Sequence, residues 1–201
     1  MPRYAAIDIG SNSVRMLAAD VDSHGNLNPL ASDRQVTRLG ESVFGQGVIS
    51  EQAMTLVCGV LARMAQSYRK HDIKAVRAVA TAAVRDASNQ RMFLDRASEA
   101  IGSPVEIVSG QEEARLIHLG VQLRWPHPRS RVLIIDIGGG SAEIIVGGMI
   151  ANVVSPASAA VANTSVAAPA MDFSLNTYYI VVSIQGAAQN PPQAHTVMLV
   201  Q

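Results

Sequence analysis

The sequence contains the same short turn twice. The first copy is Asp-Ile-Gly-Ser-Asn-Ser, residues 8–13, and the second is Asp-Ile-Gly-Gly-Gly-Ser, residues 136–141. Each copy follows an apolar run and precedes a run with the alternation of a β-strand, so each predicts a β-hairpin. Two hairpins with one kind of turn restrict the fold strongly, because they suggest two lobes that close on one ligand from opposite sides.

The sequence around the first hairpin and between the two predicts a mixture of strands and helices, and therefore an α/β fold. The expected strands are residues 3–9, 14–21, 31–39, 75–81 and 105–108, and the expected helices are residues 50–70, 88–101 and 110–123. Residues 40–50 are typical of a Gly-rich loop that ends in an N-cap, Ser50. Residues 124–130 indicate a linker with two prolines.

The charge balance and the hydropathy pattern argue against two classes of partner. Lys plus Arg and Asp plus Glu number 16 each, so the net charge does not indicate nucleic-acid binding. No apolar run approaches the roughly 18 residues of a membrane span, and the N-terminus has no secretory signal. The single cysteine, Cys58, allows no disulfide framework. We therefore expect a cytoplasmic protein without a nucleic-acid or membrane partner.

The chemistry of the repeated turn favours phosphate binding. Glycine lets the backbone approach a ligand closely, successive N–H groups form an anion-binding concavity, and the serine hydroxyl adds a donor. The expected phosphate-binding residues are Gly10, Ser11, Asn12 and Ser13 in the first turn and Gly138, Gly139, Gly140 and Ser141 in the second. A P-loop motif and the dinucleotide-binding glycine motif are both absent from the sequence.

Three carboxylates beside the turns are candidate metal ligands. Asp8 and Asp136 each end a strand next to a turn, and Mg²⁺ takes one or two carboxylates together with phosphate and water. The alternative is that each aspartate bonds its own turn. Glu143 follows Ser141 by two residues, so the two side chains share a strand face; a solvated edge position is the alternative. Arg15 holds the corresponding place in the first hairpin, and its role stays open.

Residues 109–115, Ser-Gly-Gln-Glu-Glu-Ala-Arg, predict the start of a helix. Ser109 as N-cap and Glu112 three residues later form a capping box. Glu113 then remains in the first turn, where the helix dipole tends to keep a carboxylate ionised. Such a carboxylate beside a phosphate site can orient and deprotonate water. A solvated first-turn glutamate is the alternative interpretation.

Taken together, these motifs resemble a known family. The paired turns are similar to the phosphate loops of the actin, sugar kinase and Hsp70 superfamily, which has the actin-like ATPase (ribonuclease H-like) fold. The stretches DIGSNSVRML, SGQEEARLI and VLIIDIGGGSAEIIVG resemble, in that order, the exopolyphosphatase and guanosine pentaphosphate phosphohydrolase (Ppx/GppA) family. VTRLGESV and AVATAAVRDASN fit the same pattern. The resemblance covers about residues 5–148.

The resemblance implies an activity and assigns roles within it. It implies hydrolysis of the terminal phosphoanhydride of inorganic polyphosphate or of pppGpp, a nucleotide of the stringent response, with Mg²⁺ or another divalent cation as cofactor. Water would attack in line, without a covalent intermediate. The resemblance maps the catalytic base onto Glu113, places Glu143 in the cleft near the metal, and maps a phosphate-facing arginine onto Arg85. A guanidinium group suits that role because it grips a phosphoryl group with two hydrogen bonds.

After Gly148 the sequence changes character. Asp172 is the only charged residue in residues 149–201, where residues 177–184 and 195–200 could be short strands. We therefore expect a complete first lobe in residues 1–125, the opening hairpin of a second lobe in residues 126–148, and an unassigned tail in residues 149–201, with the second lobe truncated. The apolar second hairpin should be buried on both faces. Open strand edges would favour self-association, for example as a homodimer.

Three functions remain open at this point. The first is a phosphohydrolase of the resembled family. The second is a non-catalytic remnant that binds phosphate or nucleotide through a disrupted second lobe, and only turnover separates it from the first. The third is another actin-like ATPase, such as a kinase. The helix start at residues 109–115 argues against a kinase, because a kinase uses an aspartate there to activate a substrate hydroxyl.

Overall fold

The computed structural model describes residues 1–124, 132–146, 149–154 and 179–184. The chain divides into two compact units, Met1–Ser109 and Gly110–Gln201, which we call unit 1 and unit 2. None of the helices in the described part of the chain is long and apolar enough to span a membrane. The two units are presented separately below.

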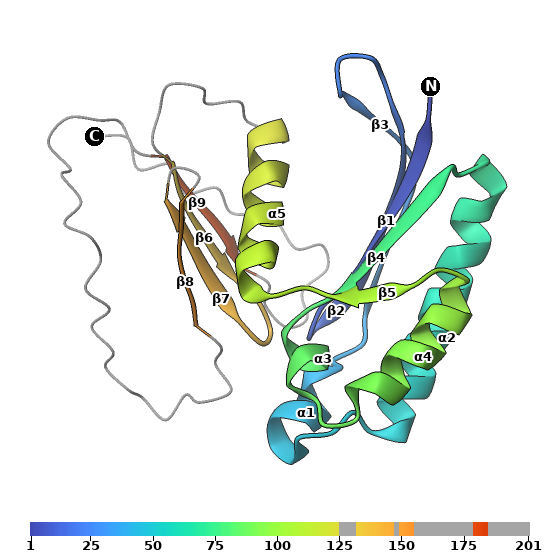
Figure 1. Ribbon diagram of the computed structural model, residues 1–201, viewed down its shortest axis with the longest axis vertical. Helices are drawn as coiled ribbons and strands as arrows, with labels where there is room; N and C mark the ends of the chain where they lie inside the picture. Colours follow the sequence, from blue (N-terminus) through green and yellow to red (C-terminus); the bar gives the residue numbers. More distant parts are fainter. Residues whose placement is uncertain (125–131, 147–148, 155–178, 185–201) are drawn as a thin grey trace, which may run out of the picture. The chain divides into compact units, whose positions relative to one another are not determined.

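Unit 1 is built on a five-stranded sheet in the order β3-β2-β1-β4-β5 (Figure 1). The strands are β1 (Arg3–Ile9), β2 (Ser13–Val21), β3 (Leu27–Val36), β4 (Ala75–Ala80) and β5 (Val105–Ile107). The first three strands form an antiparallel meander, whereas β4 pairs parallel with β1 and β5 pairs parallel with β4. Parallel neighbours need a crossover connection, which the helices of this unit supply.

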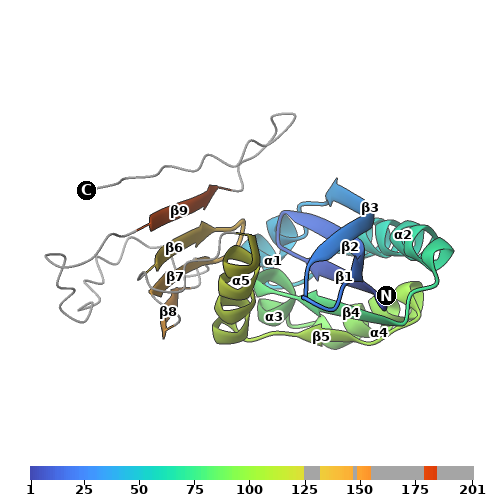
Figure 2. The same ribbon diagram turned by 90° about the horizontal axis from the view of Figure 1, so that it is seen from above.

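The helices of unit 1 are α1 (Gly40–Gln46), α2 (Glu51–Tyr68), the short 3₁₀ helix η1 (Arg69–His71), α3 (Ala82–Asp86) and α4 (Gln90–Ile101). The long helices α2 and α4 cover one face of the sheet (Figure 2), whereas α1 and α3 lie at one end of its strands (Figure 1). The Ser50 hydroxyl accepts a hydrogen bond from the Ala53 N–H at 3.2 Å, as the predicted N-cap requires. The apolar stripe predicted for α2 is completely buried; it comprises Met54, Val57, Leu61 and Met64.

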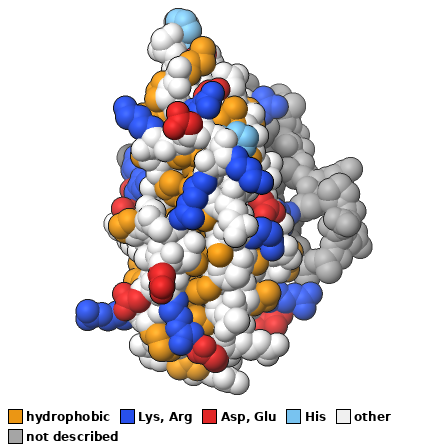
Figure 3. All heavy atoms as spheres, turned by 90° about the vertical axis from the view of Figure 1, so that its right-hand side faces the viewer, with side chains coloured by type: hydrophobic (Ala, Val, Ile, Leu, Met, Phe, Trp, Pro, Cys, Tyr) orange, Lys and Arg blue, Asp and Glu red, His pale blue; other side chains and the backbone are white. Residues whose placement is uncertain are grey.

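Strand alternation sets which side chains of β1 and β2 enter the core. Ile7, Ile9 and Val14 are at most 1% exposed and belong to the core cluster that includes the buried stripe of α2. Because successive side chains of a strand point to opposite faces, Asp8 and Arg15 lie on the face away from this core. On the side of the molecule shown in Figure 3, acidic and basic side chains are interspersed.

Two short helices of unit 1 differ from the sequence-based prediction. Residues 40–50 were expected to form a loop, which is wrong, because Gly40–Gln46 is helical. The Gly40 N–H donates to the Ser11 carbonyl oxygen at 2.8 Å. A Cβ atom on Gly40 would lie 2.5 Å from the Phe44 ring and 3.2 Å from the Ser11 Cβ, so this close approach needs a glycine. The five-residue helix α3 was not predicted.

Unit 2 combines one helix with a four-stranded sheet in the order β8-β7-β6-β9. The elements are α5 (Gly110–Arg124), β6 (Val132–Ile137), β7 (Ala142–Val146), β8 (Met149–Val154) and β9 (Tyr179–Ile184). The stretch 177–184 therefore does contain a strand, which pairs parallel with β6. The other predicted strand of the tail, residues 195–200, and most of the linker 124–130 lie outside the described residues.

The second hairpin is covered on one face by α5. Ala114, with Ile117 and Val121 at helical spacing, packs against Ile134 and Ile145. On the opposite face of β7, Ile144 is 46% exposed. The expectation that this hairpin is buried on both faces is therefore wrong for β7, because a single helix covers a single face of the sheet.

Candidate functional site: two matching hairpin turns

The two predicted turns have the same closing geometry. The Gly10 N–H donates to the Ser13 carbonyl oxygen at 3.1 Å, and the Gly138 N–H donates to the Ser141 carbonyl oxygen at 2.9 Å. A Cβ atom on Gly10 would lie 3.1 Å from that Ser13 oxygen, and one on Gly138 would lie 3.2 Å from that of Ser141. Glycine is thus favoured at the same place in both turns for the same steric reason.

A loop that follows β3 orients the peptide groups of the first turn. The Asn12 carbonyl oxygen accepts hydrogen bonds from the N–H groups of Thr37 and Arg38, both at 3.0 Å. The Ser11 carbonyl oxygen accepts a hydrogen bond from the N–H of Gly40, the first residue of α1, at 2.8 Å. In a planar trans peptide the C=O and the following N–H point in opposite directions. The N–H groups of Asn12 and Ser13 therefore point away from this loop, as an anion-binding turn requires.

The serines of the first turn are buried, and one of them fastens the turn to α3. Ser11 is 7% exposed, and its hydroxyl accepts a hydrogen bond from the Ala83 N–H at 3.2 Å. Accepting this bond leaves the hydroxyl proton of Ser11 available to donate. Ser13 is 3% exposed, and its buried hydroxyl has no hydrogen-bond partner within the described part of the chain. Both serines can therefore donate to a bound oxyanion.

The charged residues beside the turns occupy equivalent register positions. Asp8 is the cross-strand partner of Arg15 in the first hairpin, and Asp136 is the partner of Glu143 in the second. Directly opposed residues share a face of the sheet and have Cβ atoms about 4.5–5.5 Å apart. Glu143 is 1% exposed, so the alternative of a solvated edge position is wrong. The second hairpin thus presents two adjacent carboxylates.

The start of α5 separates the two neighbouring glutamates. The helix begins at Gly110, directly after Ser109 as predicted. Glu112 accepts two hydrogen bonds from Arg115, Nε to Oε2 at 2.6 Å and Nη2 to Oε1 at 2.8 Å, which raise the pKa of Arg115. Glu113 is partly buried in the same first turn. In Figure 1 this end of α5 and the β6–β7 turn lie at the same end of unit 2. The capping box itself stays a prediction.

Arg85 lies on α3 and bonds to the backbone of unit 1. Its Nη1 atom donates to the Val108 carbonyl oxygen at 2.8 Å. This bond fixes one end of the Arg85 side chain at the end of β5. The expected contact between Arg85 and a phosphate group stays a prediction.

The predicted metal ligands are divided between the units. Asp8 belongs to unit 1, whereas Asp136 and Glu143 belong to unit 2. Among the described residues, no three His, Cys, Asp or Glu side chains gather closely enough to hold a metal ion. The pair Asp136–Glu143 nevertheless offers two hard oxygen donors side by side, which suits Mg²⁺.

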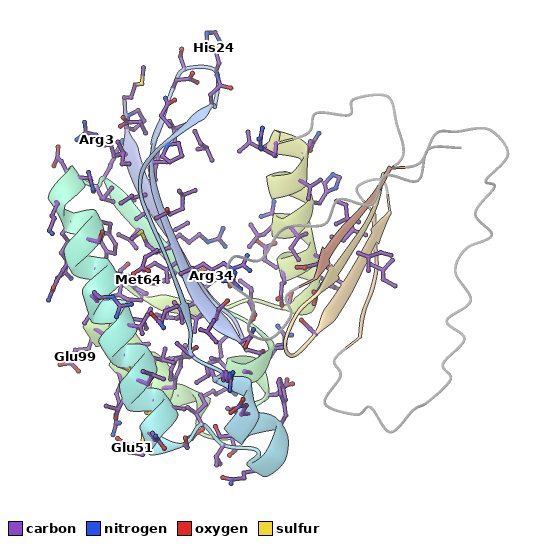
Figure 4. The ribbon with its side chains drawn as sticks, turned by 180° about the vertical axis from the view of Figure 1, so that it is seen from behind. Arg3, His24, Arg34, Glu51, Met64 and Glu99 are labelled. Atoms are coloured by element: carbon purple, nitrogen blue, oxygen red, sulfur yellow. The ribbon has the colours of Figure 1, made fainter. Side chains whose placement is uncertain are left out.

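Sequence reasoning missed one cationic pair near the first turn. Arg34, labelled in Figure 4, lies on β3 and is the cross-strand partner of Arg15. The Nε atoms of both arginines are buried without a hydrogen-bond partner in the part of the chain that is described. Burial lowers the pKa of Arg34, and the neighbouring Arg15 lowers it further. The pairing could not be derived from spacing alone, because a register shift at Ala18/Ala19 interrupts the β2–β3 ladder.

Comparison with known proteins adds to this geometry. The model of the Ppx/GppA phosphatase family matches residues 17–197. The chain belongs to this family. The Ppx/GppA match continues past Gly148 through most of the segment that the sequence left unassigned, and it begins after the first turn.

Solved Ppx/GppA structures agree with the fold. The chain is 33% identical to the Aquifex aeolicus family member, with a TM-score of 0.66, and the match covers 77% of this chain and 50% of that one. It is 32% identical to an exopolyphosphatase from Cytophaga hutchinsonii, with a TM-score of 0.70 and coverage of 76% and 49%. The α/β fold is therefore actin-like, as predicted. The chain spans about half the length of these structures.

Proposed function

We propose that this Ppx/GppA chain is a phosphatase that releases terminal phosphate from inorganic polyphosphate or from pppGpp. The observation that carries the proposal is the pair of hairpins with equal closing bonds, each with an aspartate at the same register position. One of the solved relatives is named an exopolyphosphatase. Family membership supports phosphatase chemistry, and the choice between the two substrates is left to the experiment below.

Substrate binding falls to the two turns. The N–H groups of Asn12 and Ser13 and the hydroxyl groups of Ser11 and Ser13 are the donors of the first turn. Gly138, Gly139, Gly140 and Ser141 supply the second. Donors fixed before the substrate arrives stabilise the charge that develops on the phosphate oxygens without reorganising during the reaction. This arrangement favours a phosphate chain over a neutral ligand.

We assign proton transfer from the attacking water to Glu113. Of the two glutamates at the start of α5, Glu112 is engaged by the Arg115 guanidinium through two hydrogen bonds. The Arg115 guanidinium therefore occupies both carboxylate oxygens of Glu112. Glu113 lies in the first turn of the helix, where the dipole favours the ionised carboxylate that a proton acceptor needs, and we assign it to orient water in line with the terminal phosphoryl group.

The chemistry of the second hairpin fits a divalent cation. Asp136 and Glu143 would hold Mg²⁺ between them and the substrate, with Asp8 as a third candidate ligand from the first hairpin. When bound, the cation neutralises negative charge on the phosphate oxygens. Two neighbouring carboxylates are the oxygen ligands that Mg²⁺ takes together with phosphate and water, which is the reason for placing the cation here.

The test is phosphate release by the purified chain from long-chain polyphosphate and from pppGpp, with Mg²⁺ and with EDTA. Glu113→Gln should reduce release by at least about a hundredfold, within the range of general-base catalysis. Glu112→Gln is the matched control, one residue away, and should retain most of the activity. Equal losses in the two variants would contradict the assignment of Glu113.

A second candidate is phosphate binding without turnover. It rests on the two turns alone, whose closing geometry is the same and whose donors bind phosphate whether or not Glu113 activates water. In that case the chain binds pyrophosphate or tripolyphosphate in a calorimeter, and no substrate releases phosphate.

A further inference from the structure

The hydrogen bond between Arg85 and Val108 anchors the backbone close to the end of unit 1. Val108 is 4% exposed, and its carbonyl oxygen accepts the Arg85 Nη1 proton at 2.8 Å. Its own N–H donates to the Ala80 carbonyl oxygen at 3.1 Å. Both peptide groups of Val108 are therefore fixed, one by the neighbouring strand and one by a charged side chain.

Val108 lies at the point where the chain leaves unit 1. Unit 1 ends at Ser109, and α5 begins at Gly110. Figure 1 shows β5 leading into α5 through this short connection. Because only Ser109 lies between Val108 and Gly110, the first residue of α5, the chain can reach α5 only from the place where Val108 is held.

The other end of this contact is tied to the first phosphate turn. Arg85 lies on α3, whose Ala83 N–H donates to the Ser11 hydroxyl at 3.2 Å. Directly before α3, the Thr81 N–H donates to the Ile9 carbonyl oxygen at 3.2 Å. A five-residue helix would be unstable alone, so these bonds fix the segment that carries Arg85.

We propose that Arg85 is a positioning residue, which fixes Val108, from which the chain continues into α5, relative to the first phosphate turn. The link to catalysis rests on the proposed function, in which Glu113 on α5 activates water. A charged donor suits this task, because hydrogen bonds from charged groups are stronger than those between neutral groups. A misplacement of about 1 Å at a reacting group is costly in rate.

The first test is amide hydrogen exchange in the whole chain, which needs no turnover. Arg85→Gln removes the charge, Arg85→Lys keeps it, and Arg91→Gln is the matched control on the exposed side of α4. In Arg85→Gln, exchange of the Val108 amide should be roughly ten- to a hundredfold faster, as expected for loss of a charged hydrogen bond. The exchange rate of the Ala83 amide should be unchanged in this variant. At Val108, the exchange rate of Arg85→Lys should lie between those of wild type and Arg85→Gln, and that of Arg91→Gln should equal that of wild type.

Unchanged exchange at Val108 in Arg85→Gln would overturn the proposal. If exchange at Ala83 also accelerates in that variant, α3 has unfolded and Arg85→Lys decides: faster exchange at Val108 alone supports the proposal, and wild-type exchange at Val108 overturns it.

The second test separates positioning from direct contact with phosphate. With polyphosphate, a positioning role predicts a kcat at least about tenfold lower in Arg85→Gln with KM within about twofold, because substrate binding is kept and alignment is lost. A raised KM with unchanged exchange at Val108 would assign Arg85 to the phosphate instead. A wild-type chain that releases no phosphate would count against the proposed function, and the exchange result would still decide the anchoring of Val108.

Discussion

Glu143 lies directly opposite Asp136 in the second hairpin, at the register position where the first hairpin places Arg15 opposite Asp8. The two hairpins thus have the same backbone register but carry different charges beside the turn. Asp8 has a cation across the ladder from it, whereas Asp136 has a second carboxylate. If one turn of the pair binds a divalent cation, the second is the better candidate, because opposed carboxylates attract a cation whereas the arginine opposite Asp8 repels one.

Glu143→Gln should therefore change stability in opposite directions with and without Mg²⁺. In EDTA the melting temperature should rise, because one of two adjacent negative charges is removed. The stabilisation that Mg²⁺ gives the wild type, about 2.7 kcal/mol at a hundredfold excess over Kd for a ligand that binds only the folded state, should be lost. Thermal unfolding with and without Mg²⁺ checks both effects, and Glu41→Gln on exposed α1 is the control. A Mg²⁺ response equal to that of wild type would refute this cation site.

Ser11→Ala should destabilise the protein even without a ligand. The Ala83 N–H, which is buried, loses its acceptor, and an unsatisfied buried donor costs about 1–3 kcal/mol. Urea unfolding should show this loss in the free energy of unfolding. Ser32→Ala, at an exposed position on β3, should lie within about 0.5 kcal/mol of wild type. Equal stability of the two variants would show that the Ser11 hydroxyl does not fasten α3.

Replacing glycine by alanine should weaken ligand binding in the two turns but should stabilise the fold in α2. In Gly10→Ala and Gly138→Ala the new Cβ meets a backbone oxygen at 3.1 and 3.2 Å, respectively, so the closing bond must lengthen. We expect weaker binding of pyrophosphate, by about tenfold, in titration calorimetry. Gly59→Ala, with nothing within 4 Å of the new Cβ, should raise the free energy of unfolding by about 0.5–1 kcal/mol. A stabilised turn variant would contradict the steric argument.

Arg34→Gln should stabilise the free protein. It removes one of two like charges that face each other across β2 and β3, an arrangement that destabilises antiparallel pairs by about 0.2–1 kcal/mol. The gain should shrink as salt is added, since salt screens partly exposed charges. Arg63→Gln is the opposite control, because Arg63 has Asp33 as an ion-pair partner at 3.5 Å. Chemical unfolding at low and high salt measures the free energy of unfolding of both variants. A loss of stability in Arg34→Gln would contradict the repulsion.

Local patterns of the sequence were enough for much of the fold and for the two matching turns. The doubled turn, the N-cap Ser50 and the buried stripe of α2 each depend on residues within a few positions of one another, so their physical cause can be read along the chain. The equivalence of Arg15 and Glu143 followed in the same way from their distance to the two turns. These expectations are confirmed.

The rest depended on contacts between distant segments. α1 forms where a loop was predicted because Gly40 fits closely against Ser11, and β7 exposes Ile144 because α5 covers only the other face. The Arg15–Arg34 pair and the bond from Arg85 to Val108 likewise join residues that no local pattern relates. The sequence by itself determined which polar and charged residues this chain carries at its turns. Only the tertiary structure decided what each charged side chain faces, because register and packing are set by the whole sheet rather than by neighbours in sequence.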